Sequence, residues 1–110
     1  MSDQRRLCDE ILVVDDELAM RVSLSLLLSG AGFENQAAAD GGEALRLCQT
    51  VEYPVMLLDL QMAGTDGHQV LKSLKLQQVK TRVVVVSGET SFSAVRDSLQ
   101  QGAYDFVRKP

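Results

Sequence analysis

Three short runs made entirely of apolar residues constrain the fold of this chain more than any other feature. They are Ile-Leu-Val-Val at residues 11–14, Val-Met-Leu-Leu at residues 55–58 and Val-Val-Val-Val at residues 83–86. A strand that is apolar at every position has both faces covered, as parallel strands between two layers of helices do. Weaker strand patterns occupy residues 33–39 and 104–107. The runs therefore predict a parallel sheet of five strands.

The segments between these runs have the spacing of amphipathic helices, because apolar residues recur three or four positions apart. The expected helices span residues 17–28, 41–51, 67–76 and 91–101. Asp66 is suited to cap the third of them. Strand and helix alternate along the whole chain, which predicts the α/β class. We expect a doubly wound five-stranded parallel sheet with the strand order 2-1-3-4-5.

Composition excludes several classes of function. The 110 residues are 45% hydrophobic and 24% charged, with a formal net charge of −4, so we expect no direct binding of nucleic acid. No apolar run approaches the roughly 18 residues of a membrane span, and we expect no association with membranes. The N-terminus shows no secretory signal pattern. Cys8 and Cys48 lack Cys-x-x-Cys spacing, so reduced thiols and a cytoplasmic location are expected.

The polar residues gather where the predicted strands end. Asp15 and Asp16 follow the first apolar run, Asp59 follows the second, Ser87 follows the third, and Lys109 comes just after the last strand. Each of them alone is explained by an ordinary turn or helix cap, so only the coincidence is informative. Ligands of open parallel sheets bind outside the carboxyl ends of the strands. We therefore expect these five side chains to converge on one crevice.

Such a crevice has the chemistry of a phosphoryl acceptor. Clustered carboxylates repel one another unless a hard cation neutralises them, and Mg²⁺ is the expected cation. A carboxylate beside a divalent cation and a lysine can attack a phosphoryl group and form an aspartyl phosphate. Asp59 is the best nucleophile candidate, and Asp15 and Asp16 are better placed as paired metal ligands. Ser87 would donate a hydrogen bond to the phosphoryl group, and Lys109 would offset its charge.

Taken together, these segments resemble the receiver domain of bacterial two-component response regulators, of which the chemotaxis regulator CheY is the minimal relative. The matching motifs are Ile-Leu-Val-Val-Asp-Asp-Glu (11–17), Ala-Asp-Gly-Gly-Glu-Ala-Leu (39–45), Leu-Leu-Asp-Leu-Gln-Met with Asp-Gly (57–67), Val-Ser-Gly (86–88) and Gly-Ala-Tyr-Asp-Phe-Val-Arg-Lys-Pro (102–110). Each motif is weak alone, but the combination is specific and covers nearly the whole chain. The resemblance implies a flavodoxin-like, CheY-like fold.

The resemblance also implies a phosphoacceptor and its metal ligands. Asp59 would receive a phosphoryl group from a sensor histidine kinase or a histidine phosphotransfer protein. Asp16 and Asp59 would bind Mg²⁺ directly, Asp15 would act largely through water, and Gln61 would add its backbone carbonyl. The chain would then not be an enzyme in the usual sense, because it would catalyse only its own phosphorylation and slow dephosphorylation.

A conformational switch follows from the same resemblance. Lys109 would contact the phosphoryl group, Ser87 would swing toward it, and Phe106 would turn inward with Ser87. The switched surface would be that of the fourth helix and fifth strand, together with the fifth helix of the family. It would be read by an output domain or a downstream protein.

Two departures from the family pattern stand out. Ala63 occupies the place of the usual proline, so we expect a more mobile loop after Asp59. No residue follows Pro110, so we expect one receiver domain over residues 1–110, truncated after its fifth strand with the fifth helix missing. The sheet face beside the last strand would then be uncovered. Such an apolar patch favours a homodimer.

Three alternatives remain open at this point. A receiver-like interaction module that is not phosphorylated would keep the fold without the chemistry. A flavodoxin-like electron carrier would share the strand order, but the acidic residues 15–17 would repel a flavin phosphate. A phosphatase of the haloacid dehalogenase type would need a second Asp two residues after Asp59, where Gln61 stands.

Overall fold

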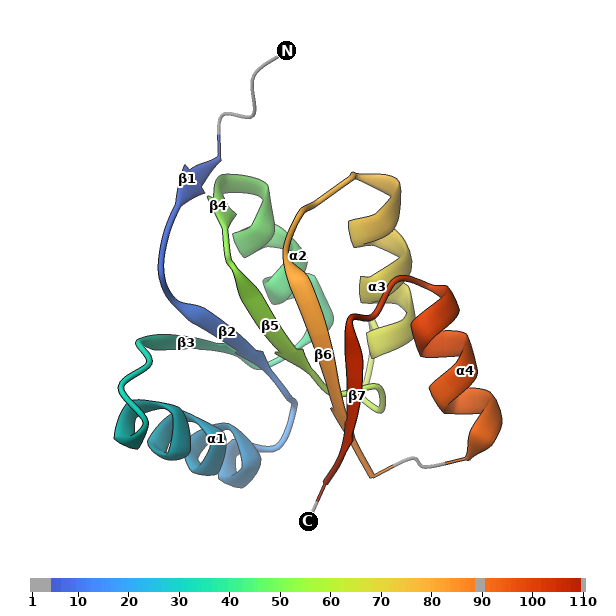
Figure 1. The fold of residues 1–110 in the computed structure, drawn as a ribbon, viewed down its shortest axis with the longest axis horizontal. Helices are drawn as coiled ribbons and strands as arrows, with labels where there is room; N and C mark the ends of the chain where they lie inside the picture. The colour runs from blue at the N-terminus through green and yellow to red at the C-terminus, as the bar shows by residue number, and fades with distance from the viewer. Residues whose placement is uncertain (1–4, 89–90, 110) are drawn as a thin grey trace.

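Five parallel strands form the central sheet of the computed structural model, which describes residues 5–88 and 91–109. In chain order they are β2 (Ile11–Val14), β3 (Asn35–Ala38), β5 (Val55–Leu58), β6 (Arg82–Ser87) and β7 (Asp105–Arg108). Their order across the sheet is β3-β2-β5-β6-β7 (Figure 1). The predicted order 2-1-3-4-5 is thereby confirmed, because the first of these strands lies between the second and the third.

Helices alternate with these strands. Those within the described residues are α1 (Leu18–Gly30), α2 (Gly41–Thr50), α3 (Gly67–Leu76) and α4 (Phe92–Gln100). Asp66 forms a capping box with Gln69 at the start of α3, as its position predicted. In this part of the chain no fifth helix follows β7. None of the four described helices is both long and apolar enough to cross a membrane.

The helices cover the two faces of the sheet unequally. On one face, Leu12, Met56 and Val85 are fully buried in a core cluster that includes residues of α2 and α3. On β5, Leu57 points the other way and is only partly buried. The prediction of strands covered on both faces therefore holds for β2, which is buried at all four positions, and only in part for β5 and β6, where Leu57 and Val84 are partly buried. The reason is that α1 packs mainly against β2 and β3 and contributes no fully buried side chain.

A second, two-stranded sheet forms where β1 (Arg6–Leu7) pairs in parallel with β4 (Val51–Glu52) (Figure 1). The sequence patterns did not predict this sheet. The prediction that placed Val51 in a helix is wrong, because α2 ends one residue before it. Two-residue strands are too short to show a period, so the sequence carries no signal for them. Directly after β4, the buried Tyr53 hydroxyl donates to Gln36 Oε1 at 2.7 Å and ties this region to β3.

The uneven covering predicts a contrast between two substitutions. Leu12→Ala removes a side chain with 0% exposure, so we expect the free energy of unfolding to fall by about 2–5 kcal/mol. Leu27→Ala removes a side chain on α1 that is 70% exposed, so we expect a change within about 0.5 kcal/mol. Urea unfolding followed by circular dichroism measures both. Equal losses would contradict the described packing of α1.

Candidate functional site

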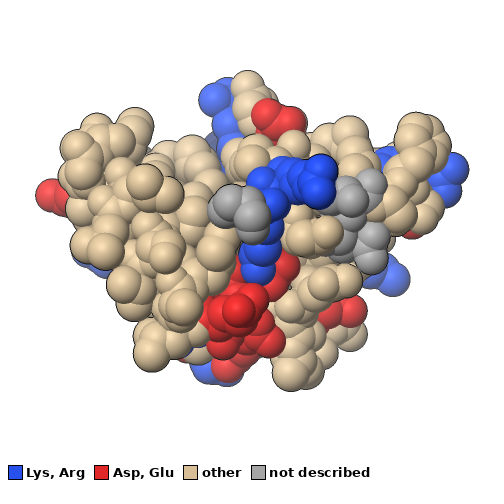
Figure 2. Space-filling model, turned by 90° about the horizontal axis from the view of Figure 1, so that it is seen from below, with Lys and Arg blue, Asp and Glu red and all other residues tan. Residues whose placement is uncertain are grey.

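The carboxyl ends of four parallel strands meet at one edge of the sheet, at the bottom of Figure 1. Val14 of β2 pairs with Leu58 of β5, so the next residues, Asp15 and Asp59, lie side by side. The Asp59 N–H donates to the Val14 carbonyl at 3.0 Å and fixes this register. Figure 2, which looks onto this edge, shows acidic side chains gathered at its centre with basic side chains beside them.

Lys109 bridges two buried carboxylates at this edge. Its Nζ lies 2.9 Å from Asp15 Oδ2 and 3.3 Å from Asp59 Oδ2. A longer contact of 3.7 Å joins Nζ to Oε1 of the exposed Glu17. The side chains of Asp15, Asp59 and Lys109 are 2%, 4% and 15% exposed, so their charges interact with little screening by water. On the neighbouring strand, the Lys109 N–H donates to the Ser87 carbonyl at 2.9 Å and places the lysine.

Burial and charge shift the pKa values of this cluster. Burial raises the pKa of Asp59, and the nearby Asp15 charge adds to the rise, while the Gln61 N–H and Lys109 oppose it. Burial alone would lower the pKa of Lys109, but its hydrogen bond to Asp15 and the charge of Asp59 outweigh this and raise it. The ammonium is therefore held in its charged form, and the ionised Asp59 is less favourable here than in water.

The donor set fits a hard divalent cation. One carboxylate oxygen from each of Asp15, Asp16 and Asp59 lies within 4.8 Å of the others. These three carboxylates exceed the single ammonium of Lys109 by two negative charges, even without the more distant Glu17, and a divalent cation such as Mg²⁺ would neutralise that excess. The Gln61 N–H donates to Asp59 Oδ1 at 3.3 Å, which brings this backbone to the cluster. The role of the Gln61 carbonyl as a ligand stays a prediction.

The two residues named for the switch lie on β6 and β7. Ser87 is fully buried at the carboxyl end of β6, where it pairs in register with Arg108. Phe106 pairs with Val85 and is partly buried against the core cluster. Ser87 thus belongs to the same edge as the carboxylates, whereas Phe106 stands three residues before Lys109 on β7. Their motion stays a prediction.

Sequence reasoning missed the contacts that orient Asp15. The Glu17 N–H donates to Asp15 Oδ1 at 2.9 Å, and Arg21 Nη1 donates to the Asp15 carbonyl at 2.8 Å. Arg21 is the one charged residue within α1. A single charge on an otherwise neutral helix is the sequence feature that indicates a specific contact for Arg21. The contact of the Glu17 N–H cannot be predicted from the sequence, because nearly every residue type has a backbone N–H.

Gly67, the first residue of α3, belongs to a motif that matches the family, but the sequence did not predict its role at the site. A Cβ placed there would overlap the Asp59 carbonyl oxygen and lie 2.6 Å from Leu60 Cα. Both are backbone atoms that cannot move aside as a flexible side chain would. The start of α3 is therefore packed directly against the backbone that presents Asp59.

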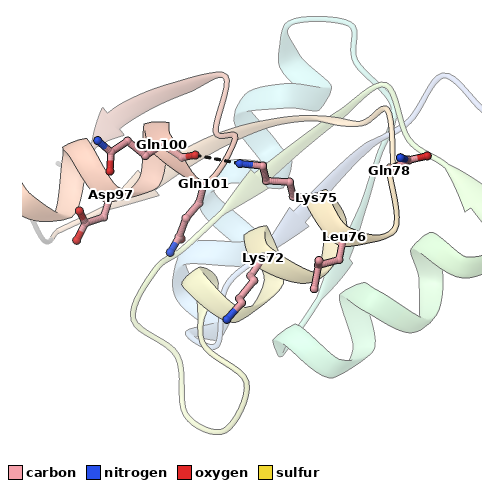
Figure 3. Close-up of a pocket in the computed structure, with 7 residues that line it drawn as sticks. All are labelled: Lys72, Lys75, Leu76, Gln78, Asp97, Gln100 and Gln101. Atoms are coloured by element: carbon pink, nitrogen blue, oxygen red, sulfur yellow. Dashed lines mark hydrogen bonds between the residues drawn. The ribbon is translucent and has the colours of Figure 1, made fainter.

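A groove elsewhere on the molecule contains none of the predicted site residues. It has a volume of about 640 Å³ and lies between the ends of α3 and α4 (Figure 3). Its lining residues are Lys72, Lys75, Leu76, Gln78, Asp97, Gln100 and Gln101. Lys75 Nζ donates to the Gln100 carbonyl at 3.3 Å across it. The carboxylate cluster lies elsewhere, at the carboxyl ends of the strands, so the volume of this groove does not identify the site.

Comparisons with known proteins agree with the resemblance drawn from the sequence. Residues 11–110 match the family model of the response regulator receiver domain, and the chain belongs to that family. It is 33% identical over 102 residues to the regulatory protein AtoC of Escherichia coli (strain K12). This match covers 93% of the chain but only 22% of AtoC, so the chain spans less than a quarter of that relative.

Solved structures show the same fold. The chemotaxis protein CheY4 of Vibrio cholerae is 30% identical with a TM-score of 0.85, over 96% of this chain and 88% of that one. The response regulator protein TrrA of Thermotoga maritima, solved in complex with Mg²⁺-BeF, is 27% identical with a TM-score of 0.84, over 94% of this chain and 88% of that one. Membership of the receiver family excludes the two alternative classes, the flavodoxin-like electron carrier and the phosphatase of the haloacid dehalogenase type.

The packing of Gly67 predicts a sharp effect of one methyl group. We expect Gly67→Ala to lower the free energy of unfolding by about 1–3 kcal/mol, because the new Cβ overlaps backbone atoms. Gly42→Ala in the first turn of α2 is the matched control, since the nearest atom to a Cβ there is 3.4 Å away. That control should be neutral or stabilising by up to about 1 kcal/mol. Denaturant unfolding of both variants decides, and equal effects would contradict the close approach.

The raised pKa of Asp59 predicts how stability depends on pH without metal. An acid whose pKa is higher in the folded state loses stability as the pH rises above its ordinary value, because the folded state disfavours the charge. We expect Asp59→Asn to be more stable than the wild type near pH 7 in a chelator. This difference should shrink as the pH falls toward about 4. Thermal unfolding across this range measures it, and a less stable Asn variant near pH 7 would contradict the sign.

Proposed function

We propose that this chain is the phosphoacceptor of a two-component system. In the proposed reaction, a phosphoryl group passes from a histidine of a sensor kinase or a phosphotransfer protein to Asp59. The observation that carries the proposal is the geometry of Asp59, a buried carboxylate 3.3 Å from the Lys109 ammonium and within 4.8 Å of two further carboxylates. A carboxylate in such surroundings suits nucleophilic attack on phosphorus more than a structural role.

The bond changes in this transfer balance simply. An Asp59 carboxylate oxygen forms the new O–P bond while the N–P bond of the donor histidine breaks. The electron pair of the broken bond goes to the imidazole nitrogen. Lys109, held charged by Asp15, offsets the charge of the phosphoryl oxygens without a proton transfer. Ser87 donates a hydrogen bond to one of those oxygens.

The metal would be held by Asp16, Asp59 and the backbone carbonyl of Gln61, with Asp15 acting through water. Bound Mg²⁺ supplies charge neutralisation at the phosphoryl oxygens and a fixed orientation for the transfer. The burial of Asp59 supports this assignment, because a buried carboxylate flanked by two others needs neutralising charge. The finding of Mg²⁺-BeF with TrrA is a property of that relative.

The proposed output is a change in the surface around α4 and β7. The phosphoryl group carries about −1.5 to −2 charges at neutral pH, while the Asp59 carboxylate gives up its own negative charge on forming the O–P bond. The added charge lies next to the lysine that is anchored to β6 through Ser87. Ser87 moves toward the new group, Phe106 turns inward, and the equilibrium between two surface states shifts. An output domain or a downstream protein would read that shift.

We propose that the domain acts in the cytoplasm, catalyses only its own phosphorylation and dephosphorylation, and binds neither nucleic acid nor membrane. Self-association of two copies stays a prediction.

Phosphorylation in vitro tests the proposal and separates it from the alternative of an unphosphorylated module. We expect the chain, incubated with Mg²⁺ and phosphoramidate, to gain the mass of one phosphoryl group in a bond that hydroxylamine cleaves. Asp59→Asn should gain none, and Lys109→Ala should react about 10²–10³-fold more slowly. Asp105→Asn, which removes an exposed carboxylate on β7, is the matched control and should react normally.

Two outcomes would overturn the assignment. One is an adduct of equal yield on Asp59→Asn, which would place the acceptor elsewhere. The other is the absence of any adduct on a folded wild-type chain, which would favour the unphosphorylated module.

A further inference from the structure

One contact at the site has no part in the proposed transfer. The backbone N–H of Ala63 donates to Asp16 Oδ2 at 3.3 Å, between residues 47 positions apart. Asp16 lies in the connection from β2 to α1, and Ala63 lies in the connection from β5 to α3. The contact therefore ties together the two loops that carry the carboxylates.

Asp16 differs from the other two carboxylates in how it is held. Asp15 and Asp59 are buried and both contact Lys109, whereas the Asp16 side chain is exposed. Among the described residues, the Ala63 N–H is the group that hydrogen-bonds to the Asp16 carboxylate. An exposed side chain samples several rotamers, and a hydrogen bond to a charged oxygen selects among them.

The chemistry of a carboxylate lets this contact persist when a cation binds. Its two oxygens offer about four acceptor positions, so Oδ2 can keep the N–H while the carboxylate also faces a metal. Hydrogen bonds to the groups that bind a metal orient those groups and strengthen binding. Every residue except proline carries such an N–H, so the contact depends on position 63 not being proline.

We propose that the Ala63 N–H is a positioning group for the metal site, which holds the Asp16 carboxylate turned toward Asp15 and Asp59. This inference rests on the proposed function, because it assumes that Mg²⁺ binds this cluster. It gives the alanine at position 63 a role through its backbone. The methyl group of Ala63 takes no part.

Magnesium binding to the unphosphorylated chain tests the proposal. We expect Ala63→Pro to raise the Mg²⁺ dissociation constant by about 3–10-fold, which is below the 10–100-fold typical of groups that orient metal ligands because this contact is exposed. Ala63→Ser keeps the N–H and is the matched control, so it should stay within about twofold of the wild type. Titration calorimetry measures all three. Unchanged affinity in the proline variant, or an equal loss in the serine variant, would overturn the proposal.

Amide hydrogen exchange without metal tests the contact itself and does not require the proline variant to fold. We expect the Ala63 amide to exchange faster in Asp16→Ala than in the wild type, and at the wild-type rate in Asp105→Ala. An unchanged rate in Asp16→Ala would overturn the proposal. Failure of the wild type to bind Mg²⁺ would instead overturn the proposed function, so the two failures are distinguishable.

Discussion

The functional end of this molecule depends on one contact, the ammonium of Lys109 between the buried carboxylates of Asp15 and Asp59. Parallel pairing places the two carboxylates on adjacent strand ends, where their charges repel each other. The lysine directly follows β7, the strand at one edge of the sheet, and its backbone N–H is hydrogen-bonded to the Ser87 carbonyl of β6. The site therefore requires β2, β5, β6 and β7 to be assembled in order, and fold and chemistry are linked through this contact.

The same arrangement supports the proposed switch. The cluster without metal keeps two negative charges more than Lys109 can balance, and burial makes the ionised Asp59 less favourable than it is in water. A cation or a phosphoryl group at this edge thus changes the net charge among buried side chains, where water screens charges only weakly. Because Lys109 and Ser87 share a backbone hydrogen bond, a change at Asp59 has a direct route to β6 and β7.

The strand order and the gathering of the site residues could be predicted from the sequence, because these residues directly follow strands with a clear apolar pattern. Four-residue apolar runs located β2 and β5 within the chain, and parallel topology then brought the residues after them to one edge. The pairing of β1 with β4 was not predictable, since two residues carry no periodic signal. The roles of Gly67 and of the Ala63 N–H were also out of reach, because both act through backbone atoms brought close by tertiary structure. Residue types do not report such contacts.

Anomalous X-ray diffraction from crystals of the unphosphorylated chain soaked in Mn²⁺, which accepts the same oxygen ligands as Mg²⁺, is the most direct measurement of the metal site. We expect one anomalous peak per chain at the carboxyl ends of β2 and β5, within bonding distance of Asp16, Asp59 and the Gln61 carbonyl. Lys109 should keep its contact with Asp15 in the same crystals. A peak held by other residues, or no peak at this edge, would contradict the assignment of the three carboxylates to a metal-dependent phosphoacceptor site.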